Sequence, residues 1–306
     1  TGKPKKIRIS KSQMIYSAQT TCRYLHLKAD NTALLCLPTR FIGGKMMVVR
    51  AFVCGLDLIP VPPSANPFSK IKEPLDFAAL TPLQCFHSLQ KLKAYPPGKI
   101  IIGGGGISKE LESRLAYIPS PVYSTYGMTE TSSHIAMRKV NGDDRSDYFR
   151  VLGSTSIDTD KRGCLIISNP FLLDSKLVTN DVVEIINDKE FKWLGRWDHV
   201  INSGGVKLIA EDMENKIAHL LSSKMLYVPL PDPVFGEIPV LVVEKEYFTN
   251  KEKEKLFMQI KSIIGKFAVP KHMLAVSSFP LTGSGKIDRI RLRELVQEKI
   301  KNLGEK

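Results

Sequence analysis

The chain has 306 residues and a formal net charge of +13, with 43% hydrophobic and 25% charged residues, which is the composition of a globular protein with room for two unequal domains. No apolar run is long enough to span a membrane, and no apolar segment follows the basic N-terminal residues as it would in a signal peptide. Much of the positive charge is scattered over predicted surface helices, so a polyanionic small ligand explains it better than nucleic acid, which stays open as an alternative.

The first 150 residues alternate between stretches with helical and with strand periodicity. Apolar residues recur at helical spacing from Met14 to Leu25, and short apolar runs bounded by glycine or proline lie between the helical stretches. Alternation of this kind predicts an α/β fold with a largely parallel sheet. In chain order we expect a helix over 11–30, a buried strand over 32–38, a helix over 43–55, a strand over 56–63, a mixed segment over 76–90, a strand over 99–102, a helix capped by Ser108 over 108–118, and a strand from 121 that enters a turn.

The pattern changes twice in the second half of the chain. Short β-runs separated by turns from about 150 to 194 are typical of an antiparallel appendage, and the residues after it mix amphipathic helices with strands, as a compact α+β domain does. We therefore expect a large N-terminal α/β domain over 1–194, a linker over 195–198 and a small α+β domain over 199–306. Within the small domain we expect a helix over 210–223, strands over 225–230 and 239–246, a helix over 254–265, a strand over 272–279 and a last helix that Asp288 can cap.

The five cysteines give an odd count and no Cys-x-x-Cys spacing. Cys36, Cys54 and Cys164 lie in apolar contexts, which is typical of buried free thiols in a reducing compartment. We therefore expect neither a zinc site nor a disulfide framework, and a cytoplasmic location fits this use of cysteine.

Four segments carry residues that could bind a nucleotide, although each also fits an ordinary turn. Four glycines at 103–106 follow a hydrophobic strand, where they would let a flat ligand approach the backbone or simply form a tight turn. At 124–131 a tyrosine can stack on a base, a threonine hydroxyl can contact a phosphate and a glutamate can hold magnesium. Asp181 opens a predicted strand, where its carboxylate can accept both hydroxyls of a ribose. The fourth segment, 194–214, joins an arginine and an aspartate to a glycine pair and then to a helix with Asp212 and Glu214 in its first turns.

The order of these motifs resembles the AMP-forming acyl-CoA synthetase, or adenylate-forming ligase, family from end to end. The glycine-rich strand, YGMTE, ND before a strand, GRWD followed by SGG, and PLTGSGKIDR succeed one another as they do in that family. The first residues, TGKPK, resemble the end of its phosphate-binding loop, and PDPVFGEIPV resembles a stretch of its small domain. In the family a further segment precedes this loop, so the resemblance implies that the front of the large domain is missing from this chain.

The resemblance implies a reaction in two steps. A carboxylate attacks the α-phosphate of Mg-ATP to give an acyl-adenylate and pyrophosphate, and the thiol of coenzyme A then displaces AMP, while the small domain acts as a mobile lid. Tyr126 would stack on the adenine, Thr129 would contact the α-phosphate, and Glu130 would hold magnesium. The residues implied for cofactor binding are Thr1, Gly2, Lys5, Gly104, Gly105, Thr125, Tyr126, Gly127, Asp181, Arg196, Gly205 and Lys207. Among them, Gly205 is the glycine past which the pantetheine thiol would arrive. The implied catalytic residues are Thr129, Glu130 and Lys286, with Lys286 as the bridge between carboxylate and α-phosphate, and Asp198 is the implied hinge.

The acyl site is implied by the segment 34–52, where the family often has a Pro-x-x-His-x-x-Gly pattern and this chain has Phe41 in place of the histidine. The compact length, the SGGVK run and the GGKMMVVRAF segment are most similar to the o-succinylbenzoate–CoA ligases of menaquinone biosynthesis. Their substrate has a second carboxylate, which Arg40 or Arg50 could bind, although Arg50 could equally lie on a helix surface. Further candidates for lining this site are Ser132, Ser133 and His134.

Other functions stay open beside this one. Within the class they are another aryl- or acyl-CoA synthetase and a stand-alone adenylation domain, and from another class a non-catalytic protein that binds a nucleotide or nucleic acid. The presence of Glu130, Asp181 and Lys286 argues against a degenerate relative. We expect a small carboxylic acid, ATP or AMP, Mg²⁺ and coenzyme A as ligands, no nucleic-acid partner and no membrane insertion, with a homodimer as an assembly that the sequence leaves open.

Overall fold

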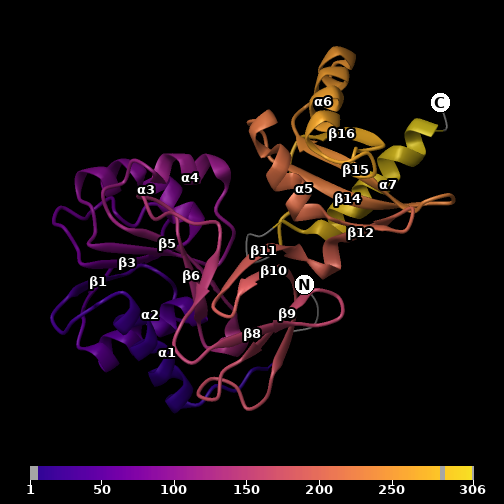
Figure 1. Ribbon diagram of the computed structural model, residues 1–306. Coiled ribbons are helices and arrows are strands. Elements are labelled where there is room, and N and C mark those ends of the chain that lie inside the picture. The colour runs from indigo at the N-terminus through magenta and orange to yellow at the C-terminus, as the bar shows by residue number, and fades with distance from the viewer. Residues whose placement is uncertain (1–5, 283–286, 305–306) are drawn as a thin grey trace. The chain divides into compact units, whose positions relative to one another are not determined.

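The computed structural model describes residues 6–282 and 287–304, which form two compact units. The larger unit comprises residues 6–179 and 184–193, and the smaller unit comprises the described residues of 180–183 and of the chain from 194 onward. Figure 1 shows the chain coloured from its N-terminus to its C-terminus, with elements of both units labelled. Thr1, Gly2, Lys5 and Lys286 lie outside the described residues, so the roles expected of them stay predictions.

Five parallel strands form the first part of the main sheet, in the order β2-β1-β3-β4-β5. Each neighbouring pair runs parallel, and helices supply most of the crossover connections that parallel strands require. The predicted alternation of helices and strands is confirmed here. The elements are α1 (Lys11–Tyr24), β1 (Thr32–Leu35), α2 (Ile42–Cys54), β2 (Asp57–Pro60), β3 (Phe77–Leu80), α3 (Pro82–Ala94), β4 (Lys99–Ile102), α4 (Lys109–Leu115) and β5 (Val122–Gly127).

The sheet continues beyond β5 in the order β6-β7-β11-β10-β9-β8. The pairs β5–β6, β6–β7, β7–β11 and β8–β9 are antiparallel. The antiparallel pairing predicted from about 150 to 194 is confirmed in β7–β11 and β8–β9. These strands continue the main sheet and do not form an appendage of their own, because antiparallel strands joined by short turns can extend the edge of a sheet without crossovers. These elements are η1 (Thr129–Thr131), β6 (His134–Lys139), β7 (Phe149–Val151), β8 (Ser156–Thr159), β9 (Cys164–Ser168), β10 (Leu177–Asn187) and β11 (Glu190–Arg196).

Alternate residues of the parallel strands face two different helical layers. Ile100 and Ile102 of β4 belong to a buried core with α3 and α4, whereas Ile101 between them belongs to a second core with α2 and the end of α1. Figure 1 shows α1 and α2 on one side of these strands and α3 and α4 on the other. Burial on both faces explains why these strands are continuously apolar in sequence.

The smaller unit has a sheet in the order β13-β12-β15-β14, with β16 parallel to β15. One core lies between this sheet and α5 and α6, and the other includes Leu292 and Val296 of α7, which is the predicted α+β arrangement. Within the described part of the chain, no helix is both long and apolar enough to cross a membrane. The elements are η2 (Trp197–His199), β12 (Val200–Ser203), β13 (Val206–Ile209), α5 (Ala210–Ile217), η3 (Ala218–Leu220), β14 (Met225–Asp232), β15 (Gly236–Glu244), α6 (Asn250–Ile263), β16 (His272–Val276) and α7 (Arg289–Gly304).

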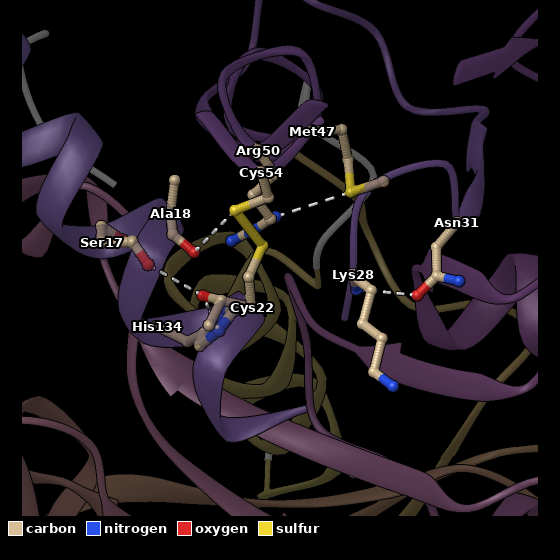
Figure 2. The surroundings of a disulfide bond; sticks show 10 residues. Ser17, Ala18, Cys22, Lys28, Asn31, Met47, Arg50, Cys54 and His134 are labelled. Carbon is tan, nitrogen blue, oxygen red and sulfur yellow. Dashed lines mark hydrogen bonds between the residues drawn. A yellow bond between two sulfur atoms is a disulfide. The ribbon is translucent and has the colours of Figure 1, made fainter. Parts of the chain in front are cut away.

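A disulfide bond joins Cys22 of α1 to Cys54 of α2, as Figure 2 shows. It corrects the prediction that Cys54 is a free thiol. The two cysteines are 32 residues apart in the sequence, and only the packing of α1 against α2 brings them within bonding distance. Cys36 and Cys164 are buried and are not disulfide-bonded, as predicted.

Candidate active site

Two of the predicted nucleotide-binding segments meet at the carboxyl ends of neighbouring parallel strands. β4 ends at Ile102 and runs into the glycines at 103–106, and β5 ends at Gly127. The Thr125 hydroxyl links the two strands by donating a hydrogen bond of 3.1 Å to the Ile102 carbonyl oxygen. A Cβ atom at Gly103 would lie 2.5 Å from Thr125 Oγ1, so this close contact requires glycine. Ligands bind at this edge of a parallel sheet in α/β folds.

Gly104 and Gly105 form an exposed strip of backbone at the same edge. A Cβ atom at Gly104 would meet no atom within 4 Å, and one at Gly105 would approach only Pro82, at 3.7 Å. The φ angle of Gly104 is +79°, which residues with a Cβ atom rarely adopt. A bare strip of this kind gives a flat ring close access to the backbone, in keeping with the predicted adenine pocket.

The ring of Tyr126 is held at the end of β5 by two phenylalanines. Its centroid lies 5.1 Å from that of Phe191, with an interplanar angle of 80°, and 5.9 Å from that of Phe149. The edge-to-face contact fixes the orientation of the tyrosine ring. Sequence reasoning missed both phenylalanines, because they come from the paired strands β7 and β11 and only the sheet register places them together.

The turn after β5 presents Thr129 and Glu130. The Thr131 hydroxyl accepts a hydrogen bond of 3.1 Å from the Met128 amide and donates one of 2.6 Å to the Ser133 carbonyl oxygen, so it fixes the shape of the turn. The Glu130 carboxylate has no hydrogen-bond or ion-pair partner among the residues that the structure describes. Mg²⁺ is usually held by one or two carboxylates together with substrate phosphates. The role of Glu130 in holding magnesium stays a prediction.

Next to this turn, the larger unit buries an arginine that has no carboxylate partner among the described residues. Arg50 of α2 is 2% exposed. Its Nη2 atom donates to Ser133 Oγ at 2.9 Å, its Nη1 atom lies 3.5 Å from Met47 Sδ, and its Nε atom has no partner within the described chain. Burial lowers the pKa of Arg50 to about 10, so the guanidinium is still charged at neutral pH and would strongly favour an incoming anion.

A directed chain of hydrogen bonds connects Arg50 to α1. The Thr21 hydroxyl donates to the Ser17 carbonyl oxygen at 3.0 Å, so it accepts from His134 Nε2 at 2.9 Å. His134 Nδ1 is then the acceptor for the Ser133 hydroxyl at 3.3 Å, and Ser133 Oγ accepts from Arg50. Burial, reinforced by the charge of Arg50, holds the pKa of His134 well below its usual value. His134 is therefore neutral, as this chain of donors and acceptors requires.

The structure brings Arg50, Ser133 and His134 together, with Ser132 beside them, and places Arg40 and Phe41 in exposed positions. Arg40 is exposed before α2, where its guanidinium lies 4.9 Å from the ring centroid of Phe41, which is 54% exposed. Ser132 is buried next to the group, with a left-handed φ of +63°. Its hydroxyl has no partner among the described residues. Of the two candidate arginines, Arg50 is thus the one in a low-dielectric setting.

A second group of predicted residues lies in the smaller unit, around Arg196. The guanidinium contacts two carboxylates, with Nη1 3.3 Å from Asp181 Oδ1 and Nη2 3.0 Å from Asp198 Oδ2. Burial alone would lower the pKa of Arg196, but these carboxylates raise it. Asn180 donates to Asp198 Oδ1 at 3.2 Å. Asp181 lies inside β10, not at its start as predicted, because the strand already begins at Leu177.

The glycine pair of the smaller unit forms the tip of the hairpin between β12 and β13. Gly204 and Gly205 have φ angles of +58° and +81°, as a two-residue hairpin turn requires. A Cβ atom at Gly205 would meet no atom within 4 Å, so this backbone is open to a ligand. Lys207 Nζ lies 4.6 Å from the ring centroid of Trp197, which holds its charge beside the hairpin.

Both halves of the chain match models of one protein family. The AMP-binding enzyme model matches residues 1–158, and the model for the C-terminal domain of AMP-binding enzymes matches residues 226–286. The curated 2-succinylbenzoate–CoA ligase of Bacillus cytotoxicus is 26% identical over 98% of this chain and 69% of its own length.

Solved structures resemble the chain over nearly its whole length. An acyl-CoA synthetase (AMP-forming)/AMP-acid ligase II-like protein of Dyadobacter fermentans is 34% identical with a TM-score of 0.62, over 94% of this chain and 85% of that protein. The o-succinylbenzoate–CoA synthetase of Bacillus subtilis, solved with its acyl-adenylate intermediate, is 19% identical with a TM-score of 0.79, over 96% of this chain and 67% of that one. At 19% identity, the similarity to the Bacillus subtilis synthetase shows a common fold and no more.

Proposed function

Because the chain belongs to the AMP-binding enzyme family, we propose that it is an AMP-forming acid–thiol ligase that converts 2-succinylbenzoate, ATP and coenzyme A into 2-succinylbenzoyl-CoA, AMP and diphosphate. The observation that carries the choice of acid is the buried guanidinium of Arg50, which has no carboxylate partner among the described residues. 2-Succinylbenzoate has two carboxylates, so one can react while Arg50 binds the other. Curated ligases named for this acid align with 97–98% of the chain, which supports the proposal.

In the first step, a carboxylate oxygen of the acid attacks the α-phosphorus of ATP and diphosphate leaves. Both reactants are anions, so the site must compensate negative charge as they approach. Mg²⁺ bound with ATP would supply part of that compensation, and Glu130 is the residue that would hold it. The Thr129 hydroxyl would contact the α-phosphate, and Tyr126 would stack on the adenine.

The residues of the smaller unit have proposed roles in binding ATP and in the second step. Asp181 would accept the ribose hydroxyls, and its ion pair with Arg196 would hold the carboxylate in position. In the second step the thiol of coenzyme A, after losing its proton, attacks the acyl carbonyl and AMP leaves. The family resemblance assigns the path of this thiol to Gly205 and the hinge to Asp198, and Lys207 stays a predicted cofactor-binding residue.

The proposed substrates also bear on where the chain works. ATP and coenzyme A are intracellular, so we propose a cytoplasmic location, and a homodimer stays a prediction. A second candidate is a ligase for another aryl or acyl acid. It is favoured by the 34% identity to the acyl-CoA synthetase-like protein of Dyadobacter fermentans, which exceeds the 26% identity to the Bacillus cytotoxicus ligase.

The proposal is tested by measuring diphosphate release with 2-succinylbenzoate, ATP and coenzyme A, alongside benzoate, a fatty acid and an analogue that lacks the second carboxylate. Arg50→Met should raise the KM for 2-succinylbenzoate by about 100-fold and leave the KM for ATP within about twofold. Arg40→Met is the matched control and should change neither constant. Equal turnover of the analogue, or an equal effect of Arg50→Met on both substrates, would contradict the proposed substrate.

A further inference from the structure

Two sets of bonds connect helices α1 and α2 near Arg50. One tie is the disulfide between Cys22 and Cys54, and the other is the hydrogen-bond chain that runs from Thr21 through His134 to the arginine. Cys22 directly follows Thr21, and Cys54 lies one helical turn after Arg50, on the same side of α2. Figure 2 shows Arg50 and His134 near the disulfide. The two cysteines of the disulfide therefore lie next to the first and the last residue of the hydrogen-bond chain that positions the guanidinium.

With both ties present, the guanidinium is too deeply buried for a carboxylate to reach it without movement. Arg50 is 2% exposed; its guanidinium bonds Ser133 just before β6, and His134, the first residue of β6, is bonded to Thr21 of α1. α2 carries Arg50 itself, and β6 is fixed between β5 and β7 inside the sheet. α1 lies in the outer layer, so it is the element that can move away, and the disulfide is the bond that opposes this.

The two cysteines differ in exposure in the way that a reversible exchange requires. Cys22 is 5% exposed, whereas Cys54, at the end of α2, is only half-buried. A small disulfide in solution therefore reaches Cys54 first. Cys22 is then placed to attack the mixed disulfide from inside the protein.

We propose that thiol–disulfide exchange at Cys22 and Cys54 controls the access of an anionic substrate to Arg50, with the disulfide form closed and the dithiol form open. The inference rests on the proposed function for the identity of the anion. In the closing step, the Cys54 thiolate attacks a low-molecular-weight disulfide and releases one small thiol. The Cys22 thiolate then attacks the mixed disulfide and releases the second. Two protein thiols are oxidised, one small disulfide is reduced to two thiols, and the reverse exchange opens the site.

The test equilibrates the full chain in glutathione buffers of stepped oxidised-to-reduced ratio. Peptide mapping without reductant measures the Cys22–Cys54 link, and mass spectrometry measures the rate at which phenylglyoxal modifies Arg50. We expect modification to be about tenfold faster in the dithiol form, and the KM for 2-succinylbenzoate to be lower by a similar factor, with the KM for ATP within about twofold. Absence of the linked peptide in the oxidising buffers, or equal modification rates in both forms, would overturn the proposal.

Variants separate this pair from the other cysteines. Cys22→Ser and Cys54→Ser should behave like the dithiol form in every buffer, whereas Cys85→Ser, at a buried free thiol, should keep the full redox response. A response that persists in Cys54→Ser would also refute the switch. If neither redox form releases diphosphate with 2-succinylbenzoate while Arg50 reactivity still follows the disulfide, the switch is supported and the proposed acid is refuted.

Discussion

Replacing Arg289 with leucine should destabilise the smaller unit by about 3–5 kcal/mol, because the change leaves a buried carboxylate without its cation. Arg289 begins α7, and its Nη1 and Nη2 atoms donate to the two carboxylate oxygens of Glu214 at 3.0 and 2.8 Å. The exposed fractions of the two side chains are only 19% and 13%. Nη1 also lies 3.3 Å from the Tyr227 carbonyl oxygen, so the guanidinium joins α7 to both α5 and β14.

The loss of stability in this variant should increase with pH. Burial raises the pKa of Glu214 above its ordinary value of 4.5, and Arg289 opposes that shift. Without the cation, the folded-state pKa rises further. A carboxyl group with a raised folded-state pKa contributes fully to stability below its unfolded-state pKa and loses that contribution as the pH rises through the folded-state value. The deficit at pH 8 should therefore exceed the deficit at pH 5 by about 1 kcal/mol or more.

Urea titration followed by hydrogen exchange, read on peptides from β14 and α7, measures this deficit in the smaller unit alone. Arg293→Leu is the matched control: its contact with Glu237 is longer, at 3.4 Å, and its side chain is 39% exposed, so it should cost less than about 1 kcal/mol. The double variant Arg289→Leu/Glu214→Leu should recover most of the loss, since the carboxylate with the two shortest contacts to Arg289 is removed together with its cation. A deficit no larger than that of the control, or one that is independent of pH, would refute this reasoning.

Three further predictions concern the site. Lys286→Ala should abolish adenylate formation, measured as diphosphate release, and largely spare thioester formation from pre-made adenylate; equal loss in both steps would count against the proposed bridging role. Asp181→Asn should raise the KM for ATP by about tenfold in initial-rate assays and leave the KM for the acid unchanged, because the amide lacks the negative charge that pairs with Arg196 and that would accept hydrogen bonds from the ribose hydroxyls. Gly127→Ala should lower the unfolding free energy by about 2–4 kcal/mol, because its Cβ atom would lie 2.3 Å from the Ser133 carbonyl oxygen. Gly106→Ala, which has open space around it, should leave urea unfolding unchanged.

Local patterns in the sequence were sufficient to predict most helices and strands and to identify the family. Ser108 caps α4 as predicted, with its hydroxyl accepting from the Leu111 amide, and Asp288 accepts from the Arg291 amide at the start of α7. Such caps act within one helical turn, so a short stretch of sequence contains all of their chemistry. The same holds for the motifs from the glycine run to PLTGSGKIDR, whose order identified the family that the matches then confirmed.

Contacts between distant segments were decided by the tertiary structure. Phe149 and Phe191 hold the ring of Tyr126 only because β7 pairs with β11. The antiparallel strands extend the main sheet because they can pair at its open edge without crossovers.

Arg50 shows most clearly what the sequence left undecided. Its place in an apolar helix fitted a surface position as well as a buried one. The packing of α1 and α2 against β6 surrounds the guanidinium with the hydroxyl of Ser133 and no carboxylate among the described residues. The same packing joins Cys22 to Cys54. The burial of Arg50 and the pairing of Cys22 with Cys54 depend on which helix and strand surfaces pack together. The order of residues does not specify this packing for two cysteines that are 32 residues apart.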